Sequence, residues 1–217
     1  MNKVLSSKWT KVVLFLLGLA PIGALLWFAY QVASGRDPIA LTANPIEYIT
    51  HFTGDWTLRF LLITLAITPL RMLLNRPAIT RFRRMLGLFA FFYGCLHMLT
   101  WVWLDRQFVI SGMIEDVIKR IYITAGMTGF LAMVPLAITS TAGWVRRLGF
   151  KRWQKIHRLI YLSAAAGAVH YYWLVKSDKR LPLMYAAILA GLLAVRVVAW
   201  VRKRAISRPS ATGASPA

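Results

Sequence analysis

The chain has 217 residues, of which 58% are hydrophobic and only 16% are charged, and it carries a formal net charge of +20. Soluble domains are about 45–50% apolar and about 25% charged, so this composition excludes an ordinary soluble globular protein. The single cysteine, Cys95, excludes disulfide frameworks, cysteine-rich zinc sites and cysteine-ligated iron–sulfur clusters. A metal bound to this chain would therefore be held mainly by histidine.

Six apolar stretches meet or approach the length of a membrane span. A bilayer core of about 30 Å needs about 20 apolar helical residues. The predicted spans cover residues 9–33, 56–74, 82–104, 121–140, 156–175 and 181–201. The sequence therefore predicts an all-α integral membrane protein, with a six-helix transmembrane bundle over residues 1–206 and a disordered cytoplasmic tail over residues 207–217.

The charged residues predict the orientation of these spans. Lysine and arginine gather before the first span, in the second and fourth connections, and after the last span. The seven acids lie in or beside the other three connections, and they are Asp37, Glu47, Asp55, Asp105, Glu115, Asp116 and Asp178. Because short cytoplasmic loops retain basic residues, both termini are predicted to be cytoplasmic. Anionic lipid can neutralise this charge, so a lipid partner is expected and a nucleic-acid partner is not.

Histidines inside the spans are the first candidates for function, because ionisable side chains in a membrane are costly. His97 and His170 lie in the third and fifth predicted spans, each about eight residues from an acid at the outer end. Two imidazoles at one depth on different helices suit bis-histidine ligation of a haem. Nitrogen ligands also suit zinc or copper, but zinc normally takes more protein ligands, and no Cys, Asp or Glu is expected at this depth.

The other two histidines are harder to interpret. His51 is expected in an outer loop, as a solvated polar residue. His157 is expected near the cytoplasmic surface, and on one straight helix its side chain would point about 140° away from that of His170. It could ligate a second haem with a weaker partner, contact a flavin or quinone, or extend to the headgroups among Lys155 and Arg158.

A glycine precedes each candidate ligand by three residues, at Gly94 and Gly167. Positions three apart share a helix face, so each glycine leaves room beside the histidine for a flat macrocycle. Close packing between helices through small residues explains the glycines equally well, although it does not explain the histidines.

Several segments resemble the ferric-reductase-like transmembrane family. They are residues 83–87 leading to His97, residues 153–161 leading to His170, and the phrases at 51–54, 67–70 and 170–176. Within that family the chain resembles the haem-binding membrane subunits of the protein-methionine-sulfoxide reductase system, the MsrQ family, formerly called YedZ. The resemblance extends to about residue 204, and the chain has no room for the cytoplasmic FAD and NADPH domains of larger ferric reductases.

The resemblance implies a specific function. Members of the family lie in the bacterial inner membrane, bind haem b and FMN, and pass electrons from the quinone pool to a periplasmic molybdopterin-containing methionine sulfoxide reductase. It also implies that His97 and His170 are the haem ligands and that His157 is a third cofactor-binding histidine. No motif marks the FMN or quinone site.

The sequence therefore predicts a membrane electron-transfer subunit whose catalytic partner is a separate protein. One alternative is a stand-alone b-type cytochrome that reduces ferric iron, which would not purify with a molybdopterin enzyme. The other is a transporter or channel whose histidines relay protons, which would be colourless.

Overall fold

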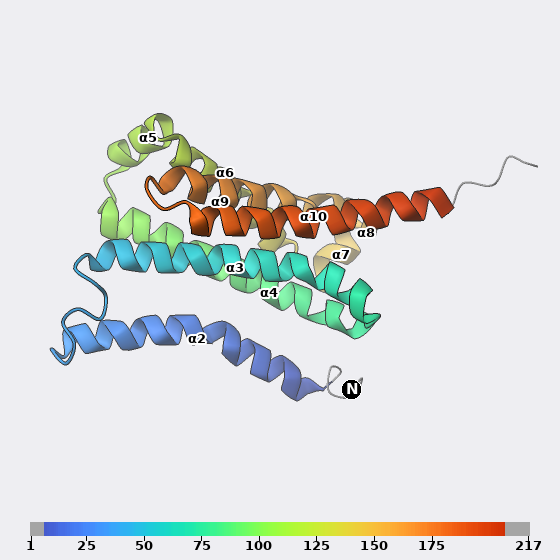
Figure 1. The fold of residues 1–217 in the computed structure, drawn as a ribbon, viewed down its shortest axis with the longest axis horizontal. Coiled ribbons are helices and arrows are strands. Elements are labelled where there is room, and N and C mark those ends of the chain that lie inside the picture. Colours follow the sequence, from blue (N-terminus) through green and yellow to red (C-terminus); the bar gives the residue numbers. More distant parts are fainter. Residues whose placement is uncertain (1–6, 207–217) are drawn as a thin grey trace, which may run out of the picture.

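The computed structural model describes residues 7–206, which form helices joined by short connections. The long helices are α2 (Lys8–Ala33), α3 (Pro45–Leu74), α4 (Arg83–Leu99), α6 (Ile121–Ile138), α9 (Leu159–Leu174) and α10 (Arg180–Ile206). The shorter ones are η1 (Pro77–Phe82), η2 (Thr100–Asp105), α5 (Ile110–Lys119), α7 (Ala142–Leu148) and α8 (Phe150–His157). Figure 1 shows the long helices running side by side, with α2 at the margin of the bundle.

The helices confirm an all-α membrane protein, but not every predicted span. Within residues 7–206, five segments are long and apolar enough to cross a membrane: Lys8–Ala33, Pro45–Leu74, Pro77–Asp105, Ile121–Ile138 and Arg180–Ala205. Helix α9 has 16 residues, and its length of about 24 Å is less than a bilayer core of about 30 Å. That α9 is a sixth crossing stays a prediction.

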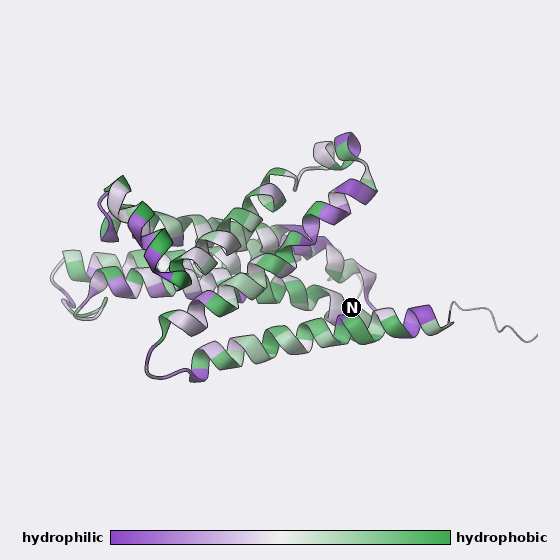
Figure 2. Ribbon diagram, turned by 90° about the horizontal axis from the view of Figure 1, so that it is seen from above, coloured by the Kyte–Doolittle hydropathy of each residue, from purple (hydrophilic) through white to green (hydrophobic). Residues whose placement is uncertain are grey.

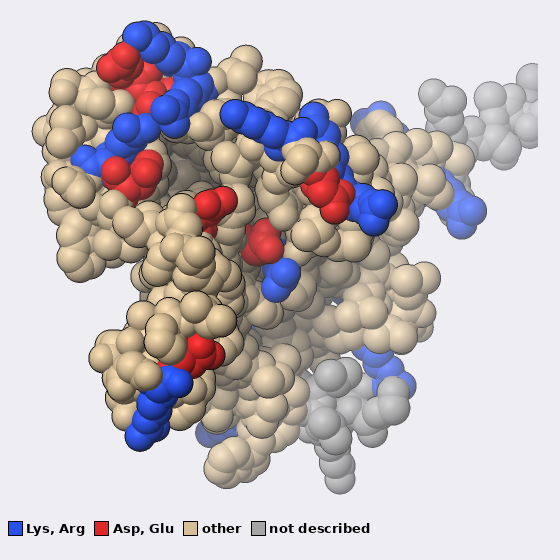
Figure 3. Space-filling model, turned by 60° about the vertical axis from the view of Figure 1, so that its left-hand side comes forward, with Lys and Arg blue, Asp and Glu red and all other residues tan. Residues whose placement is uncertain are grey.

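The two ends of the bundle differ in charge. Apolar residues follow the lengths of the helices, and hydrophilic ones gather in the connections and at helix ends (Figure 2). Helix α2 begins and α10 ends at the same end of the bundle, at the right of Figure 1. The opposite end carries the acids, with basic side chains among them (Figure 3). We call these the basic end and the acidic end. Which end faces the cytoplasm stays a prediction, and the predicted tail at 207–217 lies outside the described residues.

Helix α3 begins at Pro45 rather than at the predicted Trp56. The Asn44 side chain caps it, because its Oδ1 accepts the Glu47 N–H at 3.3 Å and its Nδ2 donates to the Glu47 carboxylate at 3.0 Å. Proline at the first helical position adds a preset backbone angle. The prediction that His51 lies in a loop is therefore wrong, because His51 belongs to the first turns of α3.

The predicted fifth span, residues 156–175, is interrupted. Helix α8 ends at His157 and α9 begins at Leu159. The Trp153 indole N–H donates to the Thr139 carbonyl at 2.9 Å, and the His157 Nε2 lies 3.1 Å from the Thr139 hydroxyl, so α8 is fixed against the end of α6. His157 and His170 thus do not share one straight helix, and the predicted angle of about 140° between them does not apply.

Two apolar cores meet on α3. In the first, the Phe60 ring stacks on Phe89 and Tyr93 of α4 at centroid distances of 5.4 and 5.3 Å. The second joins α3 to α9 and α10, and its buried residues are Leu58, Leu62, Leu65, Ala164, Ala168, Tyr185 and Leu189. Helix α3 is therefore held on both sides, which fixes its position relative to α4 and α9.

The fully buried Tyr93 attaches α2 to this core. Its hydroxyl donates to the Gly18 carbonyl at 2.9 Å and accepts from the Ile22 N–H at 3.1 Å, beside Pro21. These two backbone groups are one helical turn apart, so the hydroxyl enters the hydrogen-bond ladder of α2 next to its proline.

We expect Tyr93→Phe to lower the free energy of unfolding by about 1–3 kcal/mol, because one buried and one partly buried backbone group lose a partner. Chemical unfolding in detergent micelles measures the change. Tyr30→Phe, which removes the hydroxyl of an exposed tyrosine on α2, is the matched control. Equal stabilities of the two variants would contradict the role given to the Tyr93 hydroxyl.

Candidate cofactor site

A cavity of about 630 Å³ lies between α3, α4, η2, α6 and α9. Its volume falls in the range of about 300–1,000 Å³ that is typical of cofactor and small-molecule sites. Apolar side chains line most of it, and its polar lining residues gather toward the acidic end, at Glu47, His51, Asp55, Asp105 and Arg120. The cavity is thus an apolar chamber with a polar mouth.

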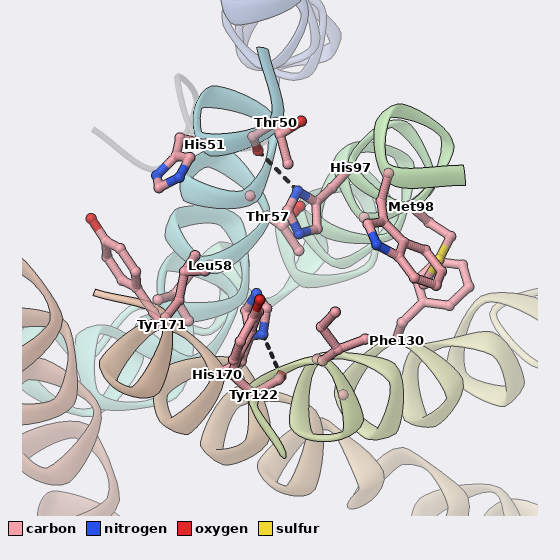
Figure 4. A pocket seen from close by; sticks show the side chains of 18 of the residues that line it. Thr50, His51, Thr57, Leu58, His97, Met98, Tyr122, Phe130, His170 and Tyr171 are labelled. Carbon is pink, nitrogen blue, oxygen red and sulfur yellow. Dashed lines mark hydrogen bonds between the residues drawn. The ribbon is translucent and has the colours of Figure 1, made fainter. Parts of the chain in front are cut away.

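His97 of α4 and His170 of α9 face one another across this cavity (Figure 4). Their ring centroids are 6.0 Å apart and the ring planes are inclined by 72°. The structure thus brings the two imidazoles of the predicted pair together. Two imidazoles that share one metal ion lie about 6 Å apart, centre to centre, when each metal–nitrogen bond is about 2 Å. The observed spacing therefore fits a single metal ion between them.

Backbone carbonyls orient both rings. His97 Nδ1 lies 2.9 Å from the Thr50 carbonyl oxygen of α3, and His170 Nδ1 lies 2.6 Å from that of Tyr122 of α6. A carbonyl oxygen only accepts, so Nδ1 carries the proton in both rings and donates it. Each Nε2 then has a free lone pair, which is the arrangement of a metal-ligating histidine.

A glycine lies one helical turn after each of these carbonyls. A methyl group at Gly54 would lie 3.0 Å from the His97 Cε1, and one at Gly126 would lie 2.8 Å from the His170 Nδ1. The missing side chains let each ring approach its carbonyl. We call these the Thr50/Gly54 turn and the Tyr122/Gly126 turn. The most extensively packed helix pairs, α3 with α4 and α6 with α9, each supply one histidine and one such turn.

The cavity also offers donors for a polar or anionic ligand. Trp101 lines it from the π-helical segment η2, and the indole N–H is buried without a hydrogen-bond partner among the described residues. A buried donor without a partner calls for an explanation, and a bound ligand that accepts its hydrogen bond would provide one. Arg120 lies at the mouth, where its guanidinium is 3.1 Å from Asp116 and 3.2 Å from the Tyr122 hydroxyl.

The described residues offer no cluster of further metal ligands beside the two imidazoles. Within residues 7–206, no group of three or more His, Cys, Asp or Glu side chains is placed to hold a metal ion. A metal between His97 and His170 would take its remaining ligands from a bound group, which a planar macrocycle supplies. The residues present therefore fit a haem.

The glycines singled out in the sequence serve two purposes. Gly94 and Gly167 both line the cavity. A methyl group at Gly94 would lie 2.8 Å from Met133, whereas one at Gly167 would lie 3.6 Å from Leu58, which is an ordinary contact. Gly94 thus allows close helix packing, and both glycines limit the bulk beside the cavity.

The remaining histidines lie apart from this pair. His51 lines the mouth of the cavity from α3 and is exposed. His157 lies outside the cavity lining, at the end of α8, where its ring is 4.0 Å from that of Trp153. Sequence reasoning found the facing pair but missed Gly54 and Gly126, because their role depends on which helices are neighbours.

Known relatives identify the family. Residues 53–168 match the ferric reductase like transmembrane component family. The chain is 50% identical over 196 residues to the protein-methionine-sulfoxide reductase heme-binding subunit MsrQ of Herminiimonas arsenicoxydans, across 89% of this chain and 87% of that protein. It is 51% identical to the MsrQ of Xanthomonas campestris pv. campestris strain 8004 over 197 residues, 89% of this chain and 88% of that protein. The chain belongs to the MsrQ family.

A third MsrQ relative, from Bordetella pertussis, is 47% identical over 200 residues, which cover 91% of this chain and 93% of that protein. The resemblance found in the sequence is therefore confirmed. The ferric-reductase match runs from α3 through most of α9, contains His97 and His157, and ends shortly before His170.

Proposed function

We propose that this chain is a membrane electron-transfer subunit that binds haem b between His97 and His170. The observation that carries the proposal is the facing pair of imidazoles, 6.0 Å apart and oriented so that both Nε2 atoms are free to ligate. The MsrQ relatives are named as heme-binding subunits, which supports the same group. The single cysteine is not part of a Cys-x-x-Cys-His attachment motif, so the haem is held without covalent bonds.

The residues of the cavity would hold and tune this cofactor. His97 and His170 would ligate the haem iron, and the Thr50 and Tyr122 carbonyls would raise the basicity of the two rings. The apolar walls exclude water, and the Trp101 N–H and Arg120 guanidinium suit the haem's anionic propionates. When bound, haem supplies a one-electron redox centre.

We further propose the direction of electron flow. Electrons enter from the quinone pool and leave at the acidic end to a periplasmic molybdopterin-containing methionine sulfoxide reductase, in the bacterial inner membrane. The distribution of basic residues supports a periplasmic acidic end and cytoplasmic termini. The position of the cavity mouth at the acidic end supports an acceptor on that side. The relatives' name supports a methionine sulfoxide reductase as partner, and such an enzyme reverses methionine oxidation.

His157 and FMN belong to the opposite half of this proposal. We assign His157 a cofactor contact near the basic end, separate from the cavity of His97 and His170. The support is the family resemblance together with an imidazole ring that is held by Thr139 and stacked on Trp153. FMN binding rests on the family resemblance.

Electron delivery to the partner tests the function. The purified chain is reduced with dithionite, freed of excess reductant, and mixed anaerobically with a catalytic amount of the molybdopterin reductase, too little to accept the electrons itself. We expect the reduced b-type absorption to disappear only when methionine sulfoxide is also present. Reoxidation by ferric citrate but not by the reductase with its substrate would favour the stand-alone ferric reductase. A colourless preparation after haem supplementation would favour the proton-relay transporter.

A further inference from the structure

A second cavity, of about 430 Å³, opens at the basic end between α3, α4, α9 and α10. Four cationic side chains and two large aromatic rings contribute to its lining: Arg71, Arg83, Arg196, Lys203, Tyr161 and Trp200. No carboxylate belongs to this lining. It is far along the bundle from the acids, and His97 and His170 do not line it.

Among residues 7–206, no carboxylate lies within ion-pair distance of the cations of this cavity, unlike several cations elsewhere in the chain. At the acidic end, Arg59, Arg106 and Arg120 each lie within ion-pair distance of an aspartate. At the basic end, Arg83 instead experiences the like charges of Arg71 and Arg196. Like charges gathered in a partly enclosed cavity repel, and a bound anion would offset that repulsion.

Two of the guanidinium groups are fixed in place by the protein. Arg83 Nη2 donates to the Thr68 hydroxyl at 2.7 Å, and Arg196 Nη2 donates to the Leu65 carbonyl at 2.5 Å. The Arg196 guanidinium carbon also lies 5.4 Å from the centre of the Tyr161 ring. Because these contacts order the side chains before any ligand arrives, binding would cost little conformational entropy.

Arg196 keeps one donor unused. Its Nη1 is buried and has no hydrogen-bond partner among the described residues. A buried N–H group without an acceptor is costly, and it suits an oxyanion that reaches it from the cavity. Guanidinium groups match the oxygens of phosphate in geometry and charge.

We propose that this cavity binds a phosphate group, with Arg83 and Arg196 as its hydrogen-bond donors and Arg71 and Lys203 as additional positive charges. Two molecules could carry that phosphate: a phosphate monoester with a planar ring, such as FMN, or an anionic phospholipid. The rings of Tyr161 and Trp200 provide apolar contact for a flat ring or an acyl chain. The flavin case rests on the FMN binding of the proposed function, whereas the lipid case does not.

The flavin case is tested by titrating the full-length chain in detergent with FMN and with riboflavin, which has the same ring without the phosphate. Flavin fluorescence reports binding. We expect FMN to bind about tenfold or more tightly than riboflavin, and Arg196→Gln and Arg83→Gln to weaken FMN binding about 10- to 100-fold, as expected for a lost charge-assisted hydrogen bond. Arg146→Gln, an exposed arginine at the same end but outside the cavity, is the matched control and should bind FMN as wild type does.

The lipid case is tested by native mass spectrometry after exchange into mixed micelles with phosphatidylglycerol or phosphatidylcholine. Retained phosphatidylglycerol that is lost in Arg196→Gln and Arg83→Gln, but kept in Arg146→Gln, would support the site with a lipid as its source, even if FMN does not bind. Thermal unfolding shows whether each variant is folded, and the exposed Lys203→Gln is the substitution least expected to disturb packing.

The proposal is overturned if neither ligand responds to the cavity variants more than to Arg146→Gln. FMN that binds equally to all variants would place the flavin elsewhere and leave the proposed FMN function intact. The absence of any FMN binding, with phosphatidylglycerol retained through Arg83 and Arg196, would remove FMN from the proposed function and leave the phosphate site intact.

Discussion

Replacing either His97 or His170 with alanine is expected to remove the haem from the cavity between them. Losing a group that merely supports a metal ligand costs about 10- to 100-fold in affinity, and losing the ligand itself costs at least as much. The haem-to-protein ratio, measured by pyridine haemochrome after purification in detergent, should therefore fall by about tenfold or more for this site. Because both imidazoles would bond to one iron, the double variant should lose no more haem than either single variant.

The control for this experiment is His51→Ala. His51 also lines the cavity, but it is exposed at the mouth and is not one of the facing pair. We expect it to retain haem as wild type does. Normal haem content in His97→Ala or in His170→Ala would refute the ligand assignment, and an additive loss in the double variant would argue for two separate binding sites.

The second large effect is expected at Gly126. A methyl group there would lie 2.8 Å from the His170 Nδ1, so the ring would have to leave the Tyr122 carbonyl that orients it. Outer contacts of this kind typically contribute about 10- to 100-fold to metal affinity. We therefore expect Gly126→Ala to lower haem occupancy under limiting haem and to shift the midpoint potential, both of which a spectroelectrochemical titration measures.

Gly191→Ala is the matched substitution for Gly126→Ala. Gly191 lies in α10, and a methyl group there would meet nothing within 4 Å. Alanine is favoured over glycine in a helix by about 1 kcal/mol, so this control should be at least as stable as wild type and should keep its haem. If Gly126→Ala and Gly191→Ala behaved alike, the Tyr122/Gly126 turn would have no part in positioning His170.

Much of this architecture could be predicted from the sequence. Apolar length marks the spans, and the residue distances from His97 and His170 to the nearest charged segments place both imidazoles at one depth. The sequence also carries a signal for where α3 begins, because Asn44, Pro45 and Glu47 form a helix-capping signature. The polar residues that follow, including His51 and Asp55, favour a loop when a span is recognised by apolar length alone.

The rest of the site depends on which helices are neighbours. The contact of His97 with the Thr50/Gly54 turn joins two positions 47 residues apart in the chain. Nothing in the local sequence around Gly54 or Gly126 shows which ring will lie against it. The break between α8 and α9 is likewise a tertiary effect, because Trp153 and His157 are held by Thr139 at the end of another helix.

The measurement that tests the central claim most directly is the low-temperature electron paramagnetic resonance spectrum of the oxidised, haem-loaded chain, with His97→Ala and His170→Ala beside it. If the two imidazoles together hold one haem iron, wild type gives a low-spin ferric signal that each substitution abolishes. A high-spin signal in wild type, or a low-spin signal that survives in either variant at full intensity, would contradict the account.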